Sequence, residues 1–259
     1  MSVIFQVVSF SASDKYIQIC KESGDITALD EAKVPAAKKS FTEQGCLGVY
    51  HGLRLEDGTT GYLFTVWDPL DKLRASTDVI SSFINVMASA PPLSQQSFTV
   101  TGNHPLSALH APVTELVVLT PHKAADGLTS HKVKYALTAH KVKYALTAHK
   151  GGDGLTPHKA GDGLTPHQVE DGLTTHNEEN GKQTLTGMRT VASELAKVGA
   201  ESFWGPCVEE PQVCGMICGW ESMEAHQATV GKPPFSTLIG SIAAIAEIGY
   251  GHAKLEKIA

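Results

Sequence analysis

The most constraining feature of this 259-residue sequence is that two of its segments match each other without a gap. Residues 50–52 (Tyr-His-Gly) align with residues 203–205 (Phe-Trp-Gly), and the same shift aligns an acidic motif that begins at Trp67 with one that begins at Trp220. Between these landmarks each segment has turn residues flanked by residues typical of strands. We therefore expect one β-hairpin in each half of the chain.

The elements around each hairpin are expected to follow the same order. In the first half, strand, helix, hairpin, helix and strand are predicted at residues 3–10, 29–44, 50–67, 72–87 and 97–101. In the second half they are predicted at residues 114–119, 184–198, 203–220, 235–247 and 250–255. The order β-α-β-β-α-β is typical of a ferredoxin-like unit. The boundaries of the two units are predicted as residues 1–111 and 112–259.

A ferredoxin-like unit covers one face of its sheet with both helices and leaves the other face without a cover. Two units in one chain can bury these apolar faces by packing sheet against sheet. The sequence therefore predicts an α+β fold in which two ferredoxin-like units form one barrel. Pairing within a single chain is the simpler expectation, and exchange between two chains of a homodimer is the alternative.

The second unit is interrupted at residues 119–181 by seven consecutive nonapeptides, each of which begins Leu-Thr-x-His. Five of them end in Asp-Gly or Asn-Gly, which favours turns. The repeated histidines suggest a metal site, but nine residues separate successive side chains by roughly 30 Å in an extended chain and by about 13 Å on a helix. We therefore interpret the insert as a lengthened surface loop and assign no metal ligand.

Composition excludes some classes of partner. A net charge of −6 and a pI near 6.0 provide no cationic surface for nucleic acid. The first residues lack the pattern of a secretory signal, and no stretch reaches the roughly 18 apolar residues that a membrane span needs. We expect a cytoplasmic protein whose five cysteines are buried free thiols.

The end of each hairpin resembles a known superfamily. Trp67 with Asp68, and Trp220 with Glu221 through His226, are similar to the motif that leads into the second helix in the dimeric α+β barrel superfamily. The similarity is to its antibiotic-biosynthesis-monooxygenase-like and EthD-like branches, including fungal members such as pigment-binding chromoproteins of mushrooms. This resemblance implies an apolar cavity that binds a small molecule. Enzymes of the resembling families often need no cofactor.

Alternation along the hairpin strands indicates which side chains face such a cavity. Leu63, Thr65 and Trp67 share one face of their strand, as do Met216 and Trp220 in the second unit. His51 aligns with Trp204, so the two units differ in polarity at this point. The residues predicted to contact a ligand are Tyr50, His51, Thr65, Trp67, Trp204, Met216, Trp220, His226 and His252.

Three functions are compatible with the sequence. The first is non-catalytic binding of a small aromatic molecule, such as a pigment, with no other cofactor. The second is a cofactor-independent monooxygenase, cyclase or lyase that acts on an aromatic polyketide-like compound, with His51 as its base. The third is metal binding or assembly through the repeats. Ordinary core packing is the competing explanation for His51, Trp67 and Trp220.

Overall fold

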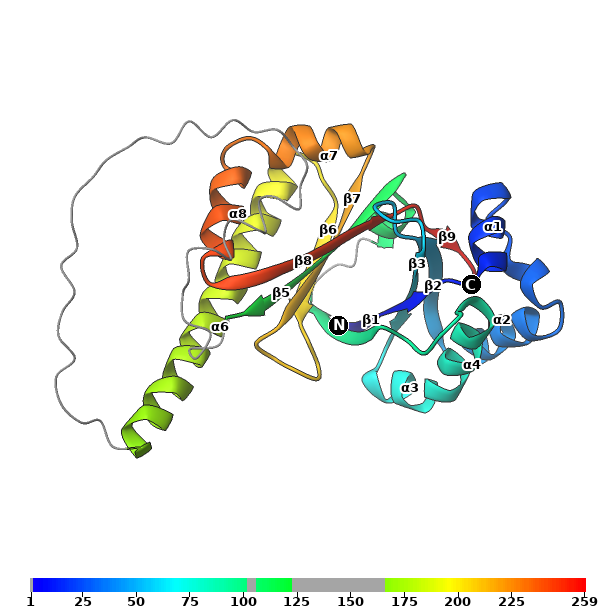
Figure 1. The fold of residues 1–259 in the computed structure, drawn as a ribbon, viewed down its shortest axis with the longest axis horizontal. Helices are drawn as coiled ribbons and strands as arrows, with labels where there is room; N and C mark the ends of the chain where they lie inside the picture. The colour runs from blue at the N-terminus through cyan, green and yellow to red at the C-terminus, as the bar shows by residue number, and fades with distance from the viewer. Residues whose placement is uncertain (1, 102–105, 123–165) are drawn as a thin grey trace.

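The computed structural model describes residues 2–101, 106–122 and 166–259. These residues form two antiparallel sheets that face each other, with helices α1 to α4 outside one sheet and α6 to α8 outside the other (Figure 1). Most of the nonapeptide insert lies outside the described residues. The interpretation of the insert as a surface loop therefore stays a prediction, as does the alternative that its histidines bind a metal ion.

The first sheet has the strand order β4-β1-β3-β2-β9. Its strands are β1 (Ser2–Ser11), β2 (Cys46–Leu53), β3 (Thr60–Trp67), β4 (Ser94–Thr101) and β9 (Glu256–Lys257). The helices on its outer face are α1 (Asp14–Glu22), α2 (Lys33–Glu43), α3 (Leu70–Ala75) and α4 (Thr77–Met87), with the 3₁₀ turn η1 (Ile26–Leu29) between α1 and α2. We call β1 to β4 with α1 to α4 the first unit.

The second sheet has the strand order β6-β7-β5-β8. Its strands are β5 (Val113–Pro121), β6 (Ser202–Pro206), β7 (Cys214–Trp220) and β8 (Ala246–Ala253). Helices α6 (Pro166–Lys197), α7 (Met223–Val230) and α8 (Phe235–Ala243) accompany it, and the turn η2 (Leu106–His110) precedes it. We call β5 to β8 with α6 to α8 the second unit. Both units place their fourth, first, third and second strands in that order, which confirms the predicted ferredoxin-like barrel fold.

Alternation along the strands produces two kinds of core. On β1, Val3, Phe5 and Val7 point toward the other sheet, whereas Ile4 and Val8 point toward the helices. The Phe5 ring lies 5.4 Å from the ring of Phe64 in its own sheet and 5.3 Å from the ring of Phe203 in the opposite sheet. The sheet faces that the helices leave open therefore cover each other, within one chain.

The barrel closes at two seams where the sheets meet edge to edge. Strand β4 contacts β6, and Phe98 forms a bridge with Cys207. At the other seam Arg54 forms a bridge with Ala253, and β9 pairs with β2. The last residues of the chain thus join the first sheet, although the sequence placed them with the second unit.

Two expectations about the helices are wrong. Helix α1 was not anticipated, although Ser13 caps its N-terminus by accepting a hydrogen bond from the backbone N–H of Tyr16 at 3.3 Å. Helix α6 begins at Pro166 and therefore includes Gly172 and Gly181, which end two nonapeptides and were expected in turns. A glycine inside a helix costs about 1 kcal/mol, which a long helix anchored by packing can offset.

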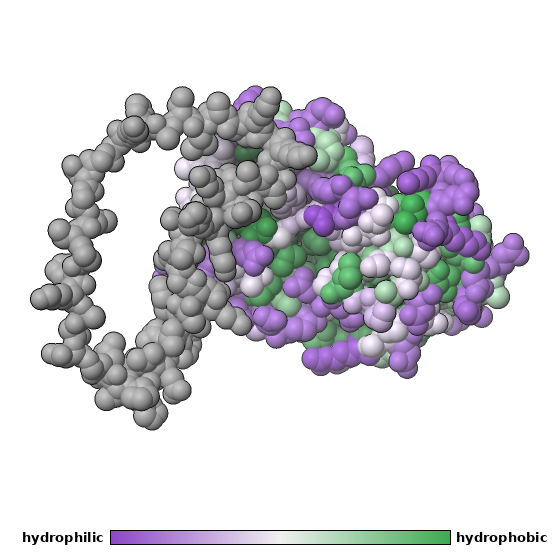
Figure 2. Space-filling model, in the orientation of Figure 1, coloured by the Kyte–Doolittle hydropathy of each residue, from purple (hydrophilic) through white to green (hydrophobic). Residues whose placement is uncertain are grey.

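The helix expected at residues 72–87 is divided into α3 and α4. The helix expected at residues 235–247 is α8, which ends at Ala243, and an additional helix, α7, precedes it. On the face shown in Figure 2, hydrophilic residues are interspersed with small hydrophobic areas, as on most folded proteins. Among the described residues, no helix combines the length and the hydropathy needed to cross a bilayer.

Candidate functional site

The second unit contains a cavity of about 140 Å³ between its sheet and helices α6, α7 and α8. Its wall is largely apolar, and Met188 and Leu195 of α6 line it together with Phe235 of α8. Gly240 is exposed on α8 and also lines the cavity, so it marks the opening to solvent. The enclosed volume is enough for one aromatic ring, and the opening leaves room for a larger aromatic molecule to extend toward solvent.

A single carboxylate, Glu115 on β5, reaches this apolar space from the sheet. The rest of β5 is rich in β-branched and other apolar residues, and alternation puts Glu115 on the face that carries Val117 and Leu119. Cys218 on β7 and His252 on β8 lie directly opposite Glu115 in the sheet register. The side chain is buried, with 8% of its surface exposed.

Helix α7 brings a histidine over this carboxylate. Ser222 caps the helix directly after β7, since its hydroxyl accepts a hydrogen bond from the backbone N–H of Ala225 at 3.1 Å. One turn into the helix, the backbone N–H of His226 donates to the carbonyl of Ser222 at 3.1 Å. The imidazole of His226 is buried and lines the cavity.

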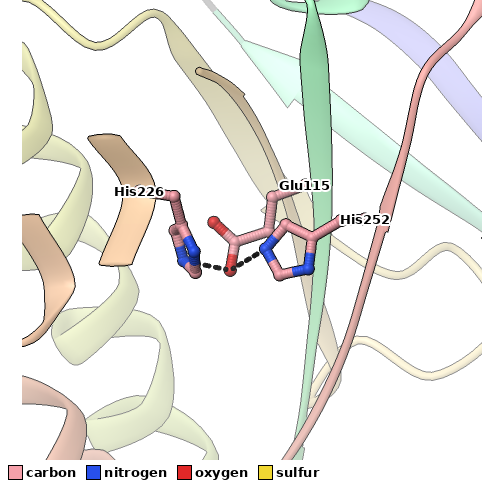
Figure 3. A group of neighbouring side chains, drawn as sticks. All are labelled: Glu115, His226 and His252. Carbon is pink, nitrogen blue, oxygen red and sulfur yellow. Dashed lines mark ion pairs between the residues drawn. The ribbon is translucent and has the colours of Figure 1, made fainter. Parts of the chain in front are cut away.

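Glu115, His226 and His252 form one compact group, which we call the Glu-His-His cluster (Figure 3). Glu115 Oε1 lies 3.4 Å from Nε2 of His226 and 3.7 Å from Nε2 of His252. The two imidazole rings have their centroids 4.5 Å apart. Each residue offers one possible ligand atom, and these three atoms lie within 4.8 Å of one another.

Residues from both units hold the cluster in place. The indole N–H of Trp220 donates to Glu115 Oε2 at 2.9 Å. Glu56, from the β2–β3 hairpin of the first unit, lies 2.6 Å from Nδ1 of His252 and also accepts from the backbone N–H of His252 at 3.2 Å. The first unit thus orients a side chain of the second.

The surroundings keep Glu115 in its charged form. Burial alone raises the pKa of this carboxyl group, but the hydrogen bond from His226, the charges of His226 and His252 and the bond from Trp220 together outweigh it. The pKa of Glu115 is therefore lowered below its ordinary value. The polar end of the cavity carries a buried carboxylate at neutral pH.

The matching positions in the first unit have no such group. The sheet registers equate Glu115 with Gln6, and Cys218 with Thr65. Trp67 donates its indole N–H to Thr65 Oγ1 at 2.8 Å, where Trp220 donates to Glu115. The same registers equate His252 with Ser97, and Leu73 occupies the place of His226.

This comparison separates the two units chemically. In the first unit, the matching positions carry neutral hydrogen-bonding groups and a leucine in a packed core. In the second unit, they carry one carboxylate and two imidazoles beside a cavity. The difference that the sequence suggested at His51 and Trp204 concerns other positions and stays a prediction.

The predicted residues of the first unit lie apart from this cavity. Tyr50 faces the space between the sheets, where its hydroxyl group lies 3.1 Å from Nε2 of His110. Thr65 and Trp67 are fully buried beneath the helices of the first unit. His51 points the same way and lies 3.0 Å from the hydroxyl group of Tyr16.

His51 also lines a second, polar cavity of about 230 Å³ beside Lys38 and Glu256. Burial is the main reason that its pKa falls to about 4, and the positive charge of Lys38 lowers it further. At neutral pH His51 is uncharged. The role of base that the sequence suggested for His51 stays a prediction. The His51 side chain lies away from the Glu-His-His cluster.

Among the predicted residues of the second unit, Met216, Trp220 and His226 line the apolar cavity, and His252 adjoins it through the cluster. Trp204 is half-buried and packs against the same helix-facing core. Sequence reasoning missed Glu115. The available signal was a lone acidic residue within a strand of apolar residues, on the face that alternation assigns to the helices.

The chain matches no family model and no curated protein. Solved structures that resemble it include an anthrone oxidase-like protein (12% identity, 100% of this chain and 94% of the other, TM-score 0.47). A proposed monooxygenase from Lactobacillus acidophilus has 12% identity, with 100% and 95% coverage and a TM-score of 0.44. A chlorite dismutase from Candidatus Nitrospira defluvii in complex with imidazole has 10% identity, with 97% and 90% coverage and a TM-score of 0.46. Similarities of this size carry no argument about activity.

Proposed function

We propose that the second unit binds a small, largely apolar aromatic molecule and exchanges a proton with it through the Glu-His-His cluster. The observation that carries this proposal is the apolar cavity whose one polar end consists of Glu115 and His226. Aromatic side chains of Trp220, Phe235 and Tyr250 line its wall and favour an aromatic ligand.

A buried carboxylate next to an imidazole is suited to general acid–base chemistry. In the Glu115–His226 pair the carboxylate orients the ring and stabilises its positive form, so the pair accepts a proton as a unit. Proton removal from a carbon or hydroxyl group is the step shared by oxygenation, cyclisation and elimination of aromatic polyketide-like compounds. The proposal therefore moves the expected base from His51 to the second unit.

Blocking the mouth of the cavity tests ligand binding. A Cβ atom added at Gly240 meets no other atom within 4 Å, so the Gly240→Leu variant is expected to fold and to place its side chain across the opening. We expect the affinity for the uncharged fluorescent dye phenylnaphthylamine to fall about 10-fold or more. Fluorescence titration measures this affinity.

Ser241→Leu is the matched control, because it adds the same side chain one position further along α8 at an exposed residue outside the cavity. Equal dye binding by both variants and the wild type would place the ligand elsewhere. Turnover is then measured on anthrone-type and phenolic compounds with the wild type and with Glu115→Gln. Binding without turnover in either protein would reduce the function to that of a carrier, such as the pigment binder suggested by the sequence.

A further inference from the structure

We propose that the Glu-His-His cluster is a binding site for a first-row divalent metal ion such as Fe²⁺, Zn²⁺ or Co²⁺. This inference rests on the proposed function of the same cavity. It goes further because it assigns a metal ion to a site for which the sequence predicted no metal. Two imidazoles and one carboxylate are a ligand set that suits these ions and leaves coordination positions open.

The distances within the cluster fit this proposal. Metal–ligand bonds of about 2.0–2.2 Å separate neighbouring ligand atoms by roughly 3.3–3.6 Å in a tetrahedral site. Glu115 Oε1 lies 3.4 Å and 3.7 Å from the Nε2 atoms of His226 and His252. The ligand atoms of the two histidines lie within 4.8 Å of each other, so rotations that bring the imidazoles closer together would place all three groups on one ion.

The hydrogen-bond contacts of His252 are a second, independent observation. Glu56 accepts hydrogen bonds from the backbone N–H of His252 and from Arg54 Nε, as an ionised carboxylate does. The Nδ1 atom of His252, 2.6 Å from Glu56, is therefore the donor. This leaves Nε2 facing Glu115, beyond hydrogen-bonding distance.

The Nε2 atom of His252 is fully buried and has no hydrogen-bond partner. Buried polar atoms in native proteins are nearly always paired, so an unpaired imidazole nitrogen directed at a carboxylate requires an explanation. A metal ion would satisfy it. The Glu56–His252 contact is also the usual outer-shell arrangement, in which a carboxylate fixes the tautomer of a histidine ligand.

The position of the cluster indicates what the ion would do. Glu115 and His226 line the apolar cavity, so an open coordination position would face a bound molecule. A bound ion would displace the proton that Glu115 and His226 otherwise share. A water molecule on the ion would lose a proton to solvent more readily than bulk water does, and the hydroxide left on the ion would accept the proton of the bound molecule and become water again.

The test uses the full-length chain, stripped with a chelator and titrated with Co²⁺, whose visible absorption reports coordination by nitrogen and oxygen. The variants Glu115→Gln, His226→Leu and His252→Ser introduce an isosteric amide or the residues found in the first unit. We expect the affinity of the cluster for Co²⁺ to fall on the order of 100-fold in each variant. At Co²⁺ concentrations that just saturate the wild-type site, each variant should therefore bind one ion fewer. The difference between proteins removes any contribution from the histidines of the repeats.

His51→Gln is the control, because it removes a buried histidine outside the cluster and should bind Co²⁺ as the wild type does. Equal binding of Co²⁺ by the wild type and all three cluster variants would overturn the inference. Circular dichroism verifies folding, and Glu115→Gln, which preserves the shape of the side chain, keeps the test valid if a histidine variant does not fold. Dye binding by the metal-free wild type separates the outcomes, since a cavity that binds the dye but no Co²⁺ retains the proposed function and loses only the metal.

Discussion

His51 illustrates how the surroundings of a single residue decide its chemistry. Sequence alignment of the two halves singled it out as a histidine where the other half has Trp204. In the fold it lies beneath helices and next to the last strand, with 2% of its surface exposed, and it hydrogen-bonds with Tyr16 and with the backbone of Gly24. Burial therefore favours the neutral imidazole and lowers its pKa to about 4.

This depressed pKa predicts an acid-sensitive contribution to stability. The unfolded chain binds a proton at His51 below about pH 6.5, whereas the folded chain resists protonation until about pH 4. Unfolding therefore takes up a proton between these values, and stability is lost as the pH falls through this window, by up to about 1.4 kcal/mol per pH unit. Urea denaturation of the wild type and of His51→Gln from pH 7 to pH 4 measures the difference.

The substitution His51→Gln removes the titrating group, so the free energy of unfolding of this variant should change less steeply over the same pH range. Other acidic groups contribute equally to both proteins. Parallel pH profiles for the two proteins would show that His51 is protonated equally in both states of the chain.

At the scale of elements, two glycines allow the edges of the sheets to meet. A Cβ atom at Gly205 on β6 would lie 1.8 Å from the carbonyl oxygen of Thr99 on β4. At the other seam, a Cβ atom at Gly52 on β2 would lie 2.3 Å from the carbonyl oxygen of Lys254. Backbone atoms cannot move aside as a flexible side chain can, so each glycine sets how closely two strands approach.

Gly205→Ala and Gly52→Ala are therefore expected to lower the free energy of unfolding by about 3 kcal/mol each. Gly240→Ala adds the same methyl group in open space on helix α8, where alanine is the better helix former, and should gain up to about 1 kcal/mol. Chemical denaturation measures all three. If Gly205→Ala were as stable as Gly240→Ala, then β4 and β6 could move apart at this seam without lowering the free energy of unfolding.

At the scale of the whole molecule, the two units share one core and should unfold together. Phe5 contacts Phe64 in its own sheet and Phe203 in the other, and its ring is almost fully buried. Phe5→Ala leaves a cavity between the sheets and should cost about 3–5 kcal/mol.

A Trp67→Phe background leaves Trp204 and Trp220 as fluorescent reporters of the second unit, while circular dichroism reports on the whole chain. We expect both signals to shift to the same lower denaturant concentration in Phe5→Ala, because the substitution in the first unit removes packing from the second. A shift in circular dichroism alone would show that the second unit is stable independently.

The same sheet framework carries a filled apolar core in one unit and an apolar cavity in the other. Beneath the helices of the first unit, the rings of Phe41, Trp67 and Phe83 pack against one another. In the second unit, the equivalent space is lined by Phe235 and by aliphatic side chains of α6 and α8, and it stays open. The hairpin that carries Glu56 links the two units at the cluster, so the first unit supports the site chemically as well as structurally.

The sequence by itself determined the α+β fold, the order of strands and the faces of residues such as Thr65 and Met216, because strand alternation and turn signals are local properties. It also identified His226 and His252, but only as separate candidates. The meeting of these histidines with Glu115 depends on three elements that are far apart in the chain, and the contact of His252 with Glu56 depends on barrel closure. Helix α6 likewise extends through glycines that signal turns locally, because its C-terminal half is packed in the core and helix propagation from an existing helix is cooperative. Only the tertiary structure could decide which unit contains the apolar cavity, since the volume between a sheet and its helices is set by all of their side chains together.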